Sequence, residues 1–133
     1  MRVYLGNRVA LSAVALVLSL GGGGASAHHG NAAYDTSKEI SVTGTVTKWQ
    51  FINPHAGIFI AVKGADGKVE EWSGEFQSIQ DLYRNHQWNK DTFKPGDVVT
   101  LYGNPHRDGE HSLWTSKVVF ADGTEVSVRD TYQ

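Results

Sequence analysis

Residues 57–86, GIFIAVKGADGKVEEWSGEFQSIQDLYRNH, decide the fold because the spacing of their apolar side chains changes partway along. Residues 57–63 and 69–76 are two short runs rich in β-branched and aromatic residues. The Asp66–Gly67 pair between them is typical of a tight turn between antiparallel strands. The stretch therefore begins with a predicted β-hairpin.

The end of the same stretch has the spacing of a helix. Ser78 followed by Asp81 resembles a capping box, in which the first side chain accepts a hydrogen bond from a free backbone N–H group. Apolar residues recur three and four positions apart, at Ile79, Leu82 and Tyr83. We expect one short helix over residues 78–86.

More strands are predicted on both sides of this stretch. Upstream, apolar residues alternate with Ser and Thr over residues 40–47, and Asn53–Pro54 is expected to end that strand. Downstream, Asn104–Pro105 is expected to end a strand in the same way. The downstream strands are expected at residues 98–102 and 112–120, with an optional sixth strand at residues 124–128.

The predicted order is mainly β, with three strands, one short helix and two strands, and it resembles the OB-fold. This fold is a small Greek-key barrel of five strands, and its ligands usually meet the loops that join strands one and two and strands four and five. The alternative is a plain antiparallel sheet packed by one helix. We expect the OB-like domain over residues 39–133, preceded by a polar N-terminal arm over residues 28–38.

Residues 1–27 have the three parts of an export signal. Two arginines precede the short apolar run Val9–Leu20, and Ala25-Ser26-Ala27 is the small-x-small pattern that signal peptidase cleaves. A membrane anchor is the alternative, but a span of the bilayer needs about 20 apolar residues. We expect general secretory export, cleavage after Ala27, and a periplasmic or secreted protein without a stable membrane anchor.

Charge and cysteine content limit the possible ligands and the sources of stability. The chain has 12 Lys and Arg against 14 Asp and Glu, and residues 1–27 hold two of the basic residues and none of the acidic ones. The formal charge of the remaining chain is therefore −4, which argues against nucleic acid because phosphate backbones are bound by clustered Lys and Arg. The chain has no cysteine, so stability comes from the core alone or from the core and a bound ion.

Two identical tripeptides, Asn53-Pro54-His55 and Asn104-Pro105-His106, are the first candidates for a site. On an OB-fold they follow strands one and four, and their loops lie on the same rim. Each tripeptide alone is also explained as a turn, because Asn-Pro favours turn initiation. We expect His55 to be the firmer metal ligand, His106 a supporting one, and Asn53 to orient the loop backbone.

Whether two further histidines can bind a metal depends on the cleavage site. If the mature chain begins with His28 and His29, the terminal amine and ring of the first form a chelate, and the second adds its ring. Nitrogen ligands of this kind suit copper(II), zinc or nickel. The alternative is an N-terminal arm without a function of its own.

The rival hypothesis is a metal-free module that binds a protein, a glycan or a small ligand on the same rim. Its contacts would come from Trp49, Phe51, Asn53, Tyr102, Asn104 and His111. The sequence offers no catalytic set, because it has no cysteine nucleophile and no Gly-x-Ser-x-Gly turn. We therefore expect a binding protein, not an enzyme.

Taken together, these features resemble a family of small exported bacterial proteins that share a domain of unknown function. The matching segments are His28-His29, Tyr34-Asp35, Thr43-Gly44-Thr45-Val46, Asn53-Pro54-His55, Asp66-Gly67-Lys68, Lys94-Pro95-Gly96-Asp97 and Ala121-Asp122-Gly123. The family usually has Gly where Gln87 precedes Trp88 here. Its second Asn-Pro-His is less regular than the first, which makes His106 the less secure ligand. The resemblance implies export and a β-barrel, and it brings no established activity.

A second resemblance concerns the choice of metal. Periplasmic copper carriers with OB-like barrels bind copper(I) through paired methionines, a histidine and a tryptophan. The only methionine here is Met1, which lies within the predicted signal. We therefore expect copper(II) or zinc rather than copper(I), and otherwise no cofactor.

Overall fold

The computed structural model describes residues 31–129, which form a mainly β domain with one helix. Along the chain the elements are β1 (Ile40–Gln50), β2 (Gly57–Lys63), β3 (Val69–Glu75), α1 (Ile79–His86), β4 (Val98–Pro105), β5 (Ser112–Phe120) and β6 (Glu125–Ser127). The predicted signal peptide, its cleavage site, His28 and His29 lie outside the described residues. Within residues 31–129, no helix is long and apolar enough to cross a bilayer.

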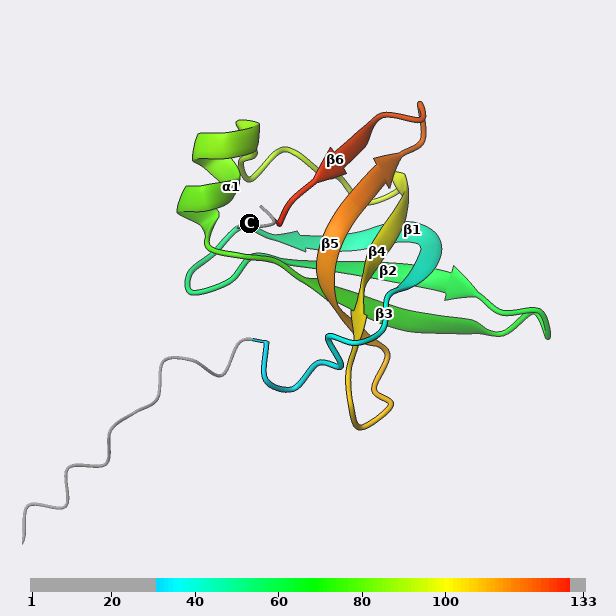
Figure 1. The fold of residues 1–133 in the computed structure, drawn as a ribbon. Helices are drawn as coiled ribbons and strands as arrows, with labels where there is room; N and C mark the ends of the chain where they lie inside the picture. The colour runs from blue at the N-terminus through cyan, green and yellow to red at the C-terminus, as the bar shows by residue number, and fades with distance from the viewer. Residues whose placement is uncertain (1–30, 130–133) are drawn as a thin grey trace, which may run out of the picture.

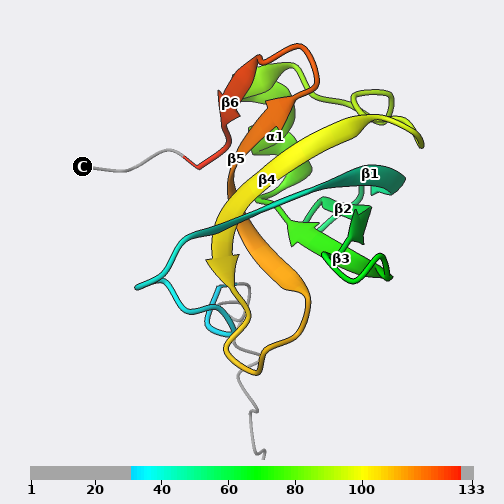
Figure 2. The same cartoon turned by 90° about the vertical axis from the view of Figure 1, so that its right-hand side faces the viewer.

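The sheet closes on itself to form a barrel (Figures 1 and 2). Its strand order is β3-β2-β1-β4-β5-β6, and β3 also pairs with β5 in parallel, with Ser73–Glu75 alongside Ser112–Trp114. The barrel therefore has five strands, with the helix between the third and the fourth, which confirms the predicted OB-like fold. The optional sixth strand is present as β6, which pairs with β5 outside this ring.

Helix α1 forms where the capping pattern predicts it. The Ser78 hydroxyl accepts a hydrogen bond from the Asp81 N–H group at 3.2 Å, and Leu82 is fully buried in the core. The helix ends at Gln87, whose φ of 60° is the left-handed conformation that favours glycine. The family that this chain resembles usually has glycine there, so its preference has a backbone cause.

A bulge in β1 changes which side chains face the core. The pairing of β1 with β2 shifts between Val46 and Lys48, so Val46 and Trp49 both contact the core although they are three positions apart. The ring of Trp49 lies 4.9 Å from that of Phe93, and its indole N–H donates to the carbonyl of Asn89 at 2.9 Å. Trp49 is therefore a packing residue, which the alternating pattern alone does not reveal.

Strand β4 ends at Pro105, which is three residues later than the expected end at residue 102. The Asn104–Pro105 pair is part of the strand, with Asn104 paired to Trp114 and Pro105 to Leu113. The β1–β4 pairing has already ended at Gly103, so the missing N–H group of the proline leaves no ladder hydrogen bond unmade on that side. The second tripeptide thus belongs largely to a strand, and only its histidine leads into the loop.

Candidate functional site

The arm before β1 packs on the outside of the barrel, where β3 meets β5. Tyr34 is only 4% exposed, and its ring lies 6.1 Å from the ring of Trp114 and 5.4 Å from that of His106. The Arg107 N–H group donates to the Ala33 carbonyl at 2.8 Å, which ties the arm to the β4–β5 loop. These contacts make a second aromatic cluster, separate from the core of the barrel.

The Tyr34 hydroxyl joins this cluster to the polar groups of β3 and β5. It donates to the Glu75 carboxylate at 2.9 Å and lies 3.0 Å from the Ser112 hydroxyl. Burial raises the pKa of Tyr34 to about 12, and the neighbouring Glu75 carboxylate adds to the rise. The arm is therefore held by a neutral phenol that donates to a half-buried carboxylate.

The first tripeptide brings its histidine to the same place. The His55 Nδ1 atom lies 3.0 Å from the Phe76 carbonyl oxygen and 4.0 Å from a carboxylate oxygen of Glu75, and the ring packs edge-on against Trp114 at 5.6 Å. A carbonyl can only accept, so the Nδ1 atom carries the proton. The other nitrogen, Nε2, has no hydrogen-bond partner among residues 31–129 and is left as an acceptor.

The second tripeptide holds its histidine in the opposite way. The His106 Nδ1 atom accepts a hydrogen bond from the Asp108 N–H group at 3.3 Å, so a neutral ring carries its proton on Nε2. The side chain is only 15% exposed, and its ring packs edge-on against Tyr34. His55 and His106 therefore lie on either side of the Tyr34–Trp114 pair, but of these two only His55 offers a ring nitrogen with a free lone pair.

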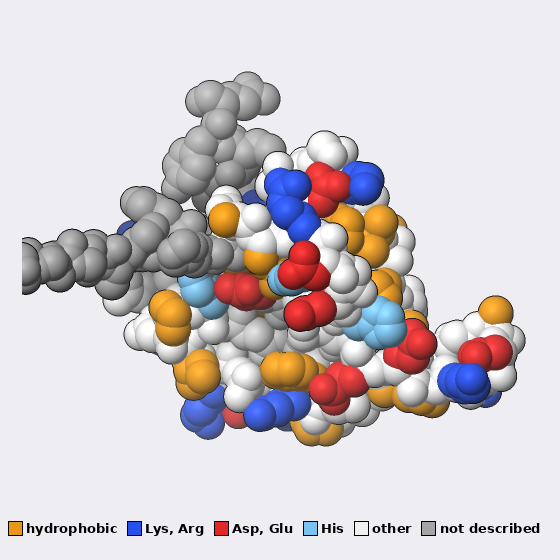
Figure 3. Space-filling model, turned by 90° about the horizontal axis from the view of Figure 1, so that it is seen from below, with side chains coloured by type: hydrophobic (Ala, Val, Ile, Leu, Met, Phe, Trp, Pro, Cys, Tyr) orange, Lys and Arg blue, Asp and Glu red, His pale blue; other side chains and the backbone are white. Residues whose placement is uncertain are grey.

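A hollow of about 330 Å³ opens beside His55. Polar groups of Tyr34, Glu75 and Ser112 line it together with the apolar side chains of Ile52 and Phe59. Its size is that of a small-ligand site, and its only charged lining residue is Glu75, which favours a cationic occupant. Figure 3 shows the lower face of the molecule, where His and acidic side chains are interspersed.

The described part of the chain does not complete a metal site. Residues 31–129 contain no group of three or more His, Asp or Glu side chains placed to hold a metal ion. They supply His55 with the Glu75 carboxylate beside it. The other expected ligands, His28 and His29, lie outside the described residues.

Most residues expected on a metal-free rim lie elsewhere. Phe51 packs beside Trp49, at 5.8 Å between rings, and Tyr102 lies on the outer face of β4 under the Lys117 amine at 4.2 Å. His111 stacks on Trp72 at 4.6 Å. The β1 bulge turns the end of β1 toward the core, which accounts for the positions of Trp49 and Phe51.

Asn53 and Asn104 also separate. Asn53 is exposed and lines the hollow beside His55, whereas Asn104 is 6% exposed and donates to the Lys38 carbonyl at 2.5 Å. Of the residues expected on the metal-free rim, Asn53 alone lines that hollow.

Several residues of the second aromatic cluster and its polar surroundings were not predicted as site residues. Tyr34 entered only as part of a family resemblance, and Glu75 and Ser112 did not enter as site residues. A signal was present for Tyr34, because it is the one large aromatic side chain in an otherwise polar arm. Nothing local marks Glu75 or Ser112, since their roles come from the parallel β3–β5 pairing.

The comparisons with known proteins give a family. The model described as "Family of unknown function (DUF6152)" matches residues 15–114, and the chain belongs to this family. No curated protein matches the chain significantly. Among solved structures, a mitochondrial single-stranded DNA binding protein from S. cerevisiae, Rim1, has a TM-score of 0.46 at 11% identity, covering 63% of this chain and 93% of its own.

Two more structures are similar over parts of larger proteins. A ZRD-deleted mutant of TiaS in complex with agmatine has a TM-score of 0.46 at 16% identity, covering 71% of this chain and 27% of its own. A tRNA fluorescent labeling enzyme has a TM-score of 0.42 at 17% identity, covering 65% of this chain and 18% of its own. At these TM-scores and identities the similarities carry no argument about this chain.

Proposed function

We propose that this DUF6152 family member is an exported periplasmic protein that binds a divalent transition metal, copper(II) or zinc, where His55 meets the N-terminal arm. The observation that carries the proposal is the orientation of the His55 ring, whose Nδ1 atom lies 3.0 Å from the Phe76 carbonyl oxygen. Metal-binding histidines commonly donate their second ring nitrogen to a carbonyl or carboxylate in this way, which holds the ring and the tautomer. The Nε2 atom is then free to bind the metal.

Glu75 supports a cation at this position. Its carboxylate lies 4.0 Å from His55 Nδ1 and accepts a hydrogen bond from the Tyr34 hydroxyl at 2.9 Å. A half-buried negative charge is partly removed from water, so it attracts a nearby cation more strongly than a fully exposed carboxylate would. Glu75 therefore acts as a neighbouring charge that favours the metal ion over an anion.

The arm can supply the missing ligands. The Tyr34 N–H group donates to the Asn31 carbonyl at 3.1 Å, so Asn31 lies beside the second aromatic cluster, to which Tyr34 belongs. His28 is three residues before Asn31, and three extended residues span about 10 Å. We propose that this length of chain lets the amine and ring of His28 and the ring of His29 reach the Nε2 atom of His55. Together they would give a nitrogen-rich site of the kind that copper(II) and zinc prefer.

We give His106 a packing role in this proposal. Its Nδ1 atom accepts from the Asp108 N–H group, and its ring is wedged against Tyr34. Binding a metal would require the ring to give up one of these interactions. Its contribution is to hold the arm in place rather than to bind the ion.

The first test concerns processing. Intact mass and N-terminal sequencing of the exported protein should find His28 as the first residue. A first residue at His29 or later would remove the amine chelate of His28 from the proposal, although His55 could still be tested separately.

The second test measures the metal itself. Calorimetric titration of copper(II) and of zinc into protein that begins at His28 should show binding far tighter than millimolar. His55→Ala should weaken it at least about tenfold, or about 1.4 kcal/mol, because one ligand of few is lost. One extra residue before His28 should also weaken binding. Affinity should fall as the pH is lowered from about 7.5 to about 5.5, since protons compete for the nitrogen ligands.

His86→Ala is the matched control. His86 lies at the end of α1 with its ring 5.8 Å from that of Trp88, far along the chain from the proposed ligands. The metal proposal fails if correctly processed protein shows no binding tighter than millimolar, or if the His55→Ala and His86→Ala proteins bind alike.

A metal-free ligand in the same hollow is the second candidate function. The volume of about 330 Å³ and the apolar side chains of Ile52 and Phe59 favour it. Ligand binding that persists in excess EDTA and in the His55→Ala protein would support this candidate over the metal site.

A further inference from the structure

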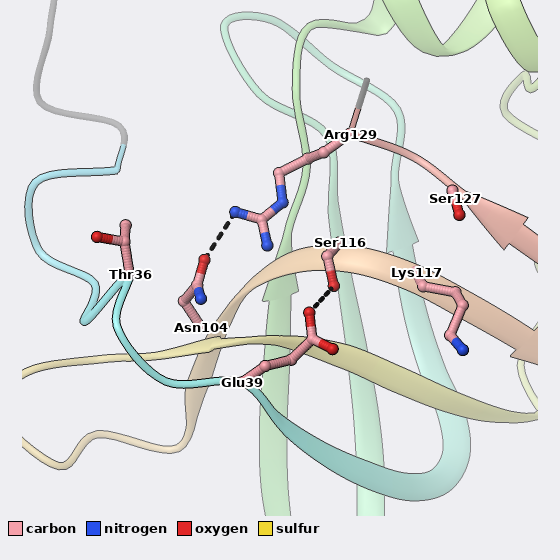
Figure 4. Close-up of a pocket in the computed structure, with 7 residues that line it drawn as sticks. All are labelled: Thr36, Glu39, Asn104, Ser116, Lys117, Ser127 and Arg129. Atoms are coloured by element: carbon pink, nitrogen blue, oxygen red, sulfur yellow. Dashed lines mark hydrogen bonds between the residues drawn. The ribbon is translucent and has the colours of Figure 1, made fainter. Parts of the chain in front are cut away.

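A second, larger hollow, formed by residues with polar side chains, lies on the barrel away from the residues that line the first. Its volume is about 580 Å³, and the two hollows share no lining residue. Figure 4 shows its side chains converging from the arm, the end of β4, the middle of β5 and the segment after β6. Its charged and amide groups are Glu39, Asn104, Lys117 and Arg129, with Ser116 beside Glu39 and Thr36 at the edge.

Arg129 is positioned by the second tripeptide. One of its guanidinium nitrogens, Nη1, donates to the Asn104 side-chain oxygen at 2.7 Å, and the Asn104 amide nitrogen donates to the Lys38 carbonyl. Asn104 is thus held on both sides and cannot turn away. The partner that it gives Arg129 is a neutral amide oxygen.

Arg129 is therefore a partly buried cation that is hydrogen-bonded to a neutral amide, and the charge of Glu39 in the same hollow acts on it only through space. Burial lowers the pKa of Arg129 from its usual value, which reflects the cost of removing its charge from water. A guanidinium has five N–H donors in a planar fork that fits a carboxylate with two parallel hydrogen bonds. The donors that Asn104 does not use are available to the hollow.

The other lining groups suit hydroxyls. Ser116 donates to the Glu39 carboxylate at 2.8 Å, and Figure 4 shows this pair across the hollow from the Arg129–Asn104 pair. Glu39 keeps further acceptor positions, while Thr36 offers a hydroxyl that can donate or accept. A lining without an apolar side chain is unsuited to an apolar ligand, because each lining group would lose its water without replacement.

We propose that this hollow binds a small hydroxylated carboxylate, of the sugar-acid class, with its carboxylate on Arg129 and its hydroxyls on Glu39, Thr36 and Ser116. The site is independent of the metal proposal, because its residues and its ligand chemistry are different. In this proposal the second Asn-Pro-His tripeptide contributes to function, because its Asn104 positions Arg129.

The test is a titration of the ¹⁵N-labelled, exported full chain with D-glucuronate in the presence of EDTA. Binding is monitored by the NMR chemical shifts of the backbone amides. D-Glucuronate should give saturable shifts at residues around the hollow, and added NaCl should weaken them. D-Glucose, which has the hydroxyls without the carboxylate, should bind at least about tenfold more weakly. Arg129→Gln should weaken D-glucuronate binding at least about tenfold, because the fork is lost.

Three variants provide controls. Arg84→Gln removes the same charge from the exposed face of α1 and should leave binding unchanged. Glu39→Gln should tighten D-glucuronate binding a few-fold, because it removes a like charge while keeping an acceptor, and this result does not depend on how Arg129→Gln folds. His55→Ala should have no effect, which separates this site from the metal site.

The proposal is overturned by any of four results. These are the absence of saturable D-glucuronate binding up to about 10 mM, D-glucose binding as tightly as D-glucuronate, equal losses in Arg129→Gln and Arg84→Gln, and inorganic phosphate competing as well as D-glucuronate. The last would mark a general anion site without selection for a sugar acid.

Discussion

The tripeptides Asn53-Pro54-His55 and Asn104-Pro105-His106 are identical in sequence and differ in almost every structural respect. The first lies in the β1–β2 loop with its asparagine and proline exposed. The second is the end of β4, with its asparagine buried and its proline paired to Leu113. The same three residues therefore make a loop in one place and a strand end in the other.

The two histidines show what the surroundings decide. At His55 the nearest backbone partner is the Phe76 carbonyl, so Nδ1 donates and Nε2 is left open. At His106 the nearest partner is the Asp108 N–H group, so Nδ1 accepts. The chemical difference between a candidate ligand and a packing residue thus comes from the partner atom and not from the tripeptide.

The largest expected difference between the tripeptides is at their asparagines. Asn104→Ala removes two hydrogen bonds and leaves the Lys38 carbonyl and the half-buried Arg129 without their partner. We expect a loss of about 2–3 kcal/mol in the free energy of unfolding, measured by urea denaturation at neutral pH. A loss below about 1 kcal/mol would mean that the buried contacts of Asn104 are replaced by water at little cost.

Substitution of His106 should lower stability, whereas substitution of His55 should lower metal affinity. His106→Ala removes an edge-on contact with Tyr34 and a hydrogen bond to Asp108, so we expect a loss of about 1–2 kcal/mol in the free energy of unfolding. Its copper(II) affinity should stay within about threefold of the unchanged protein. If calorimetry instead gives a loss as large as that of His55→Ala, the two tripeptides share the metal and the comparison is wrong.

Tyr34 lies between the two tripeptides, and the contributions of its ring and its hydroxyl can be measured separately. Tyr34→Phe keeps the ring that packs on His106 and removes the hydroxyl that bonds to Glu75 and Ser112. We expect a loss of about 1 kcal/mol in the free energy of unfolding at neutral pH.

The same variant has a pH signature. The pKa of Tyr34 is about 12 in the folded protein against an ordinary value of 10.0, so its contribution to stability is complete below pH 10 and is lost as the pH rises from 10 through about 12. Denaturation across this range should therefore show a steeper loss for the unchanged protein than for Tyr34→Phe. Parallel curves would show that folding does not raise the pKa of the Tyr34 phenol.

The smallest effect is expected at the first asparagine. The Asn53 side chain is exposed, so Asn53→Ala should change the free energy of unfolding by less than about 0.5 kcal/mol. Metal affinity should change by no more than about twofold in the same calorimetric titration. A larger drop would show that Asn53 orients the loop that carries His55, as the sequence alone led us to expect.

Local sequence patterns predicted the elements of this fold well. The hairpin around Asp66–Gly67, the capped helix after Ser78 and the order of the elements along the chain all follow from spacing and turn residues, and this order resembles that of an OB-like barrel. The boundaries failed where tertiary structure changed the local rule, at the bulge after Val46 and at Pro105.

The candidate site was predictable only in part. His55 was expected as a candidate ligand because an Asn-Pro turn places it at the end of a strand. Tyr34, Glu75 and Ser112 were not, because they meet through hydrogen bonds that join residues 41 and 78 positions apart. No periodicity or spacing in one segment reports on such pairs.

By itself, the sequence determined which segments become strands and helix, in what order, and where histidines stand next to turns. These properties depend on backbone preferences and apolar spacing within about ten residues, which any segment carries with it. Only the tertiary structure decided which histidine nitrogen is free, which asparagine is buried and where the arm packs. Those outcomes depend on partner atoms that the closed β3–β5 pairing and the continued β4 strand bring from distant parts of the chain.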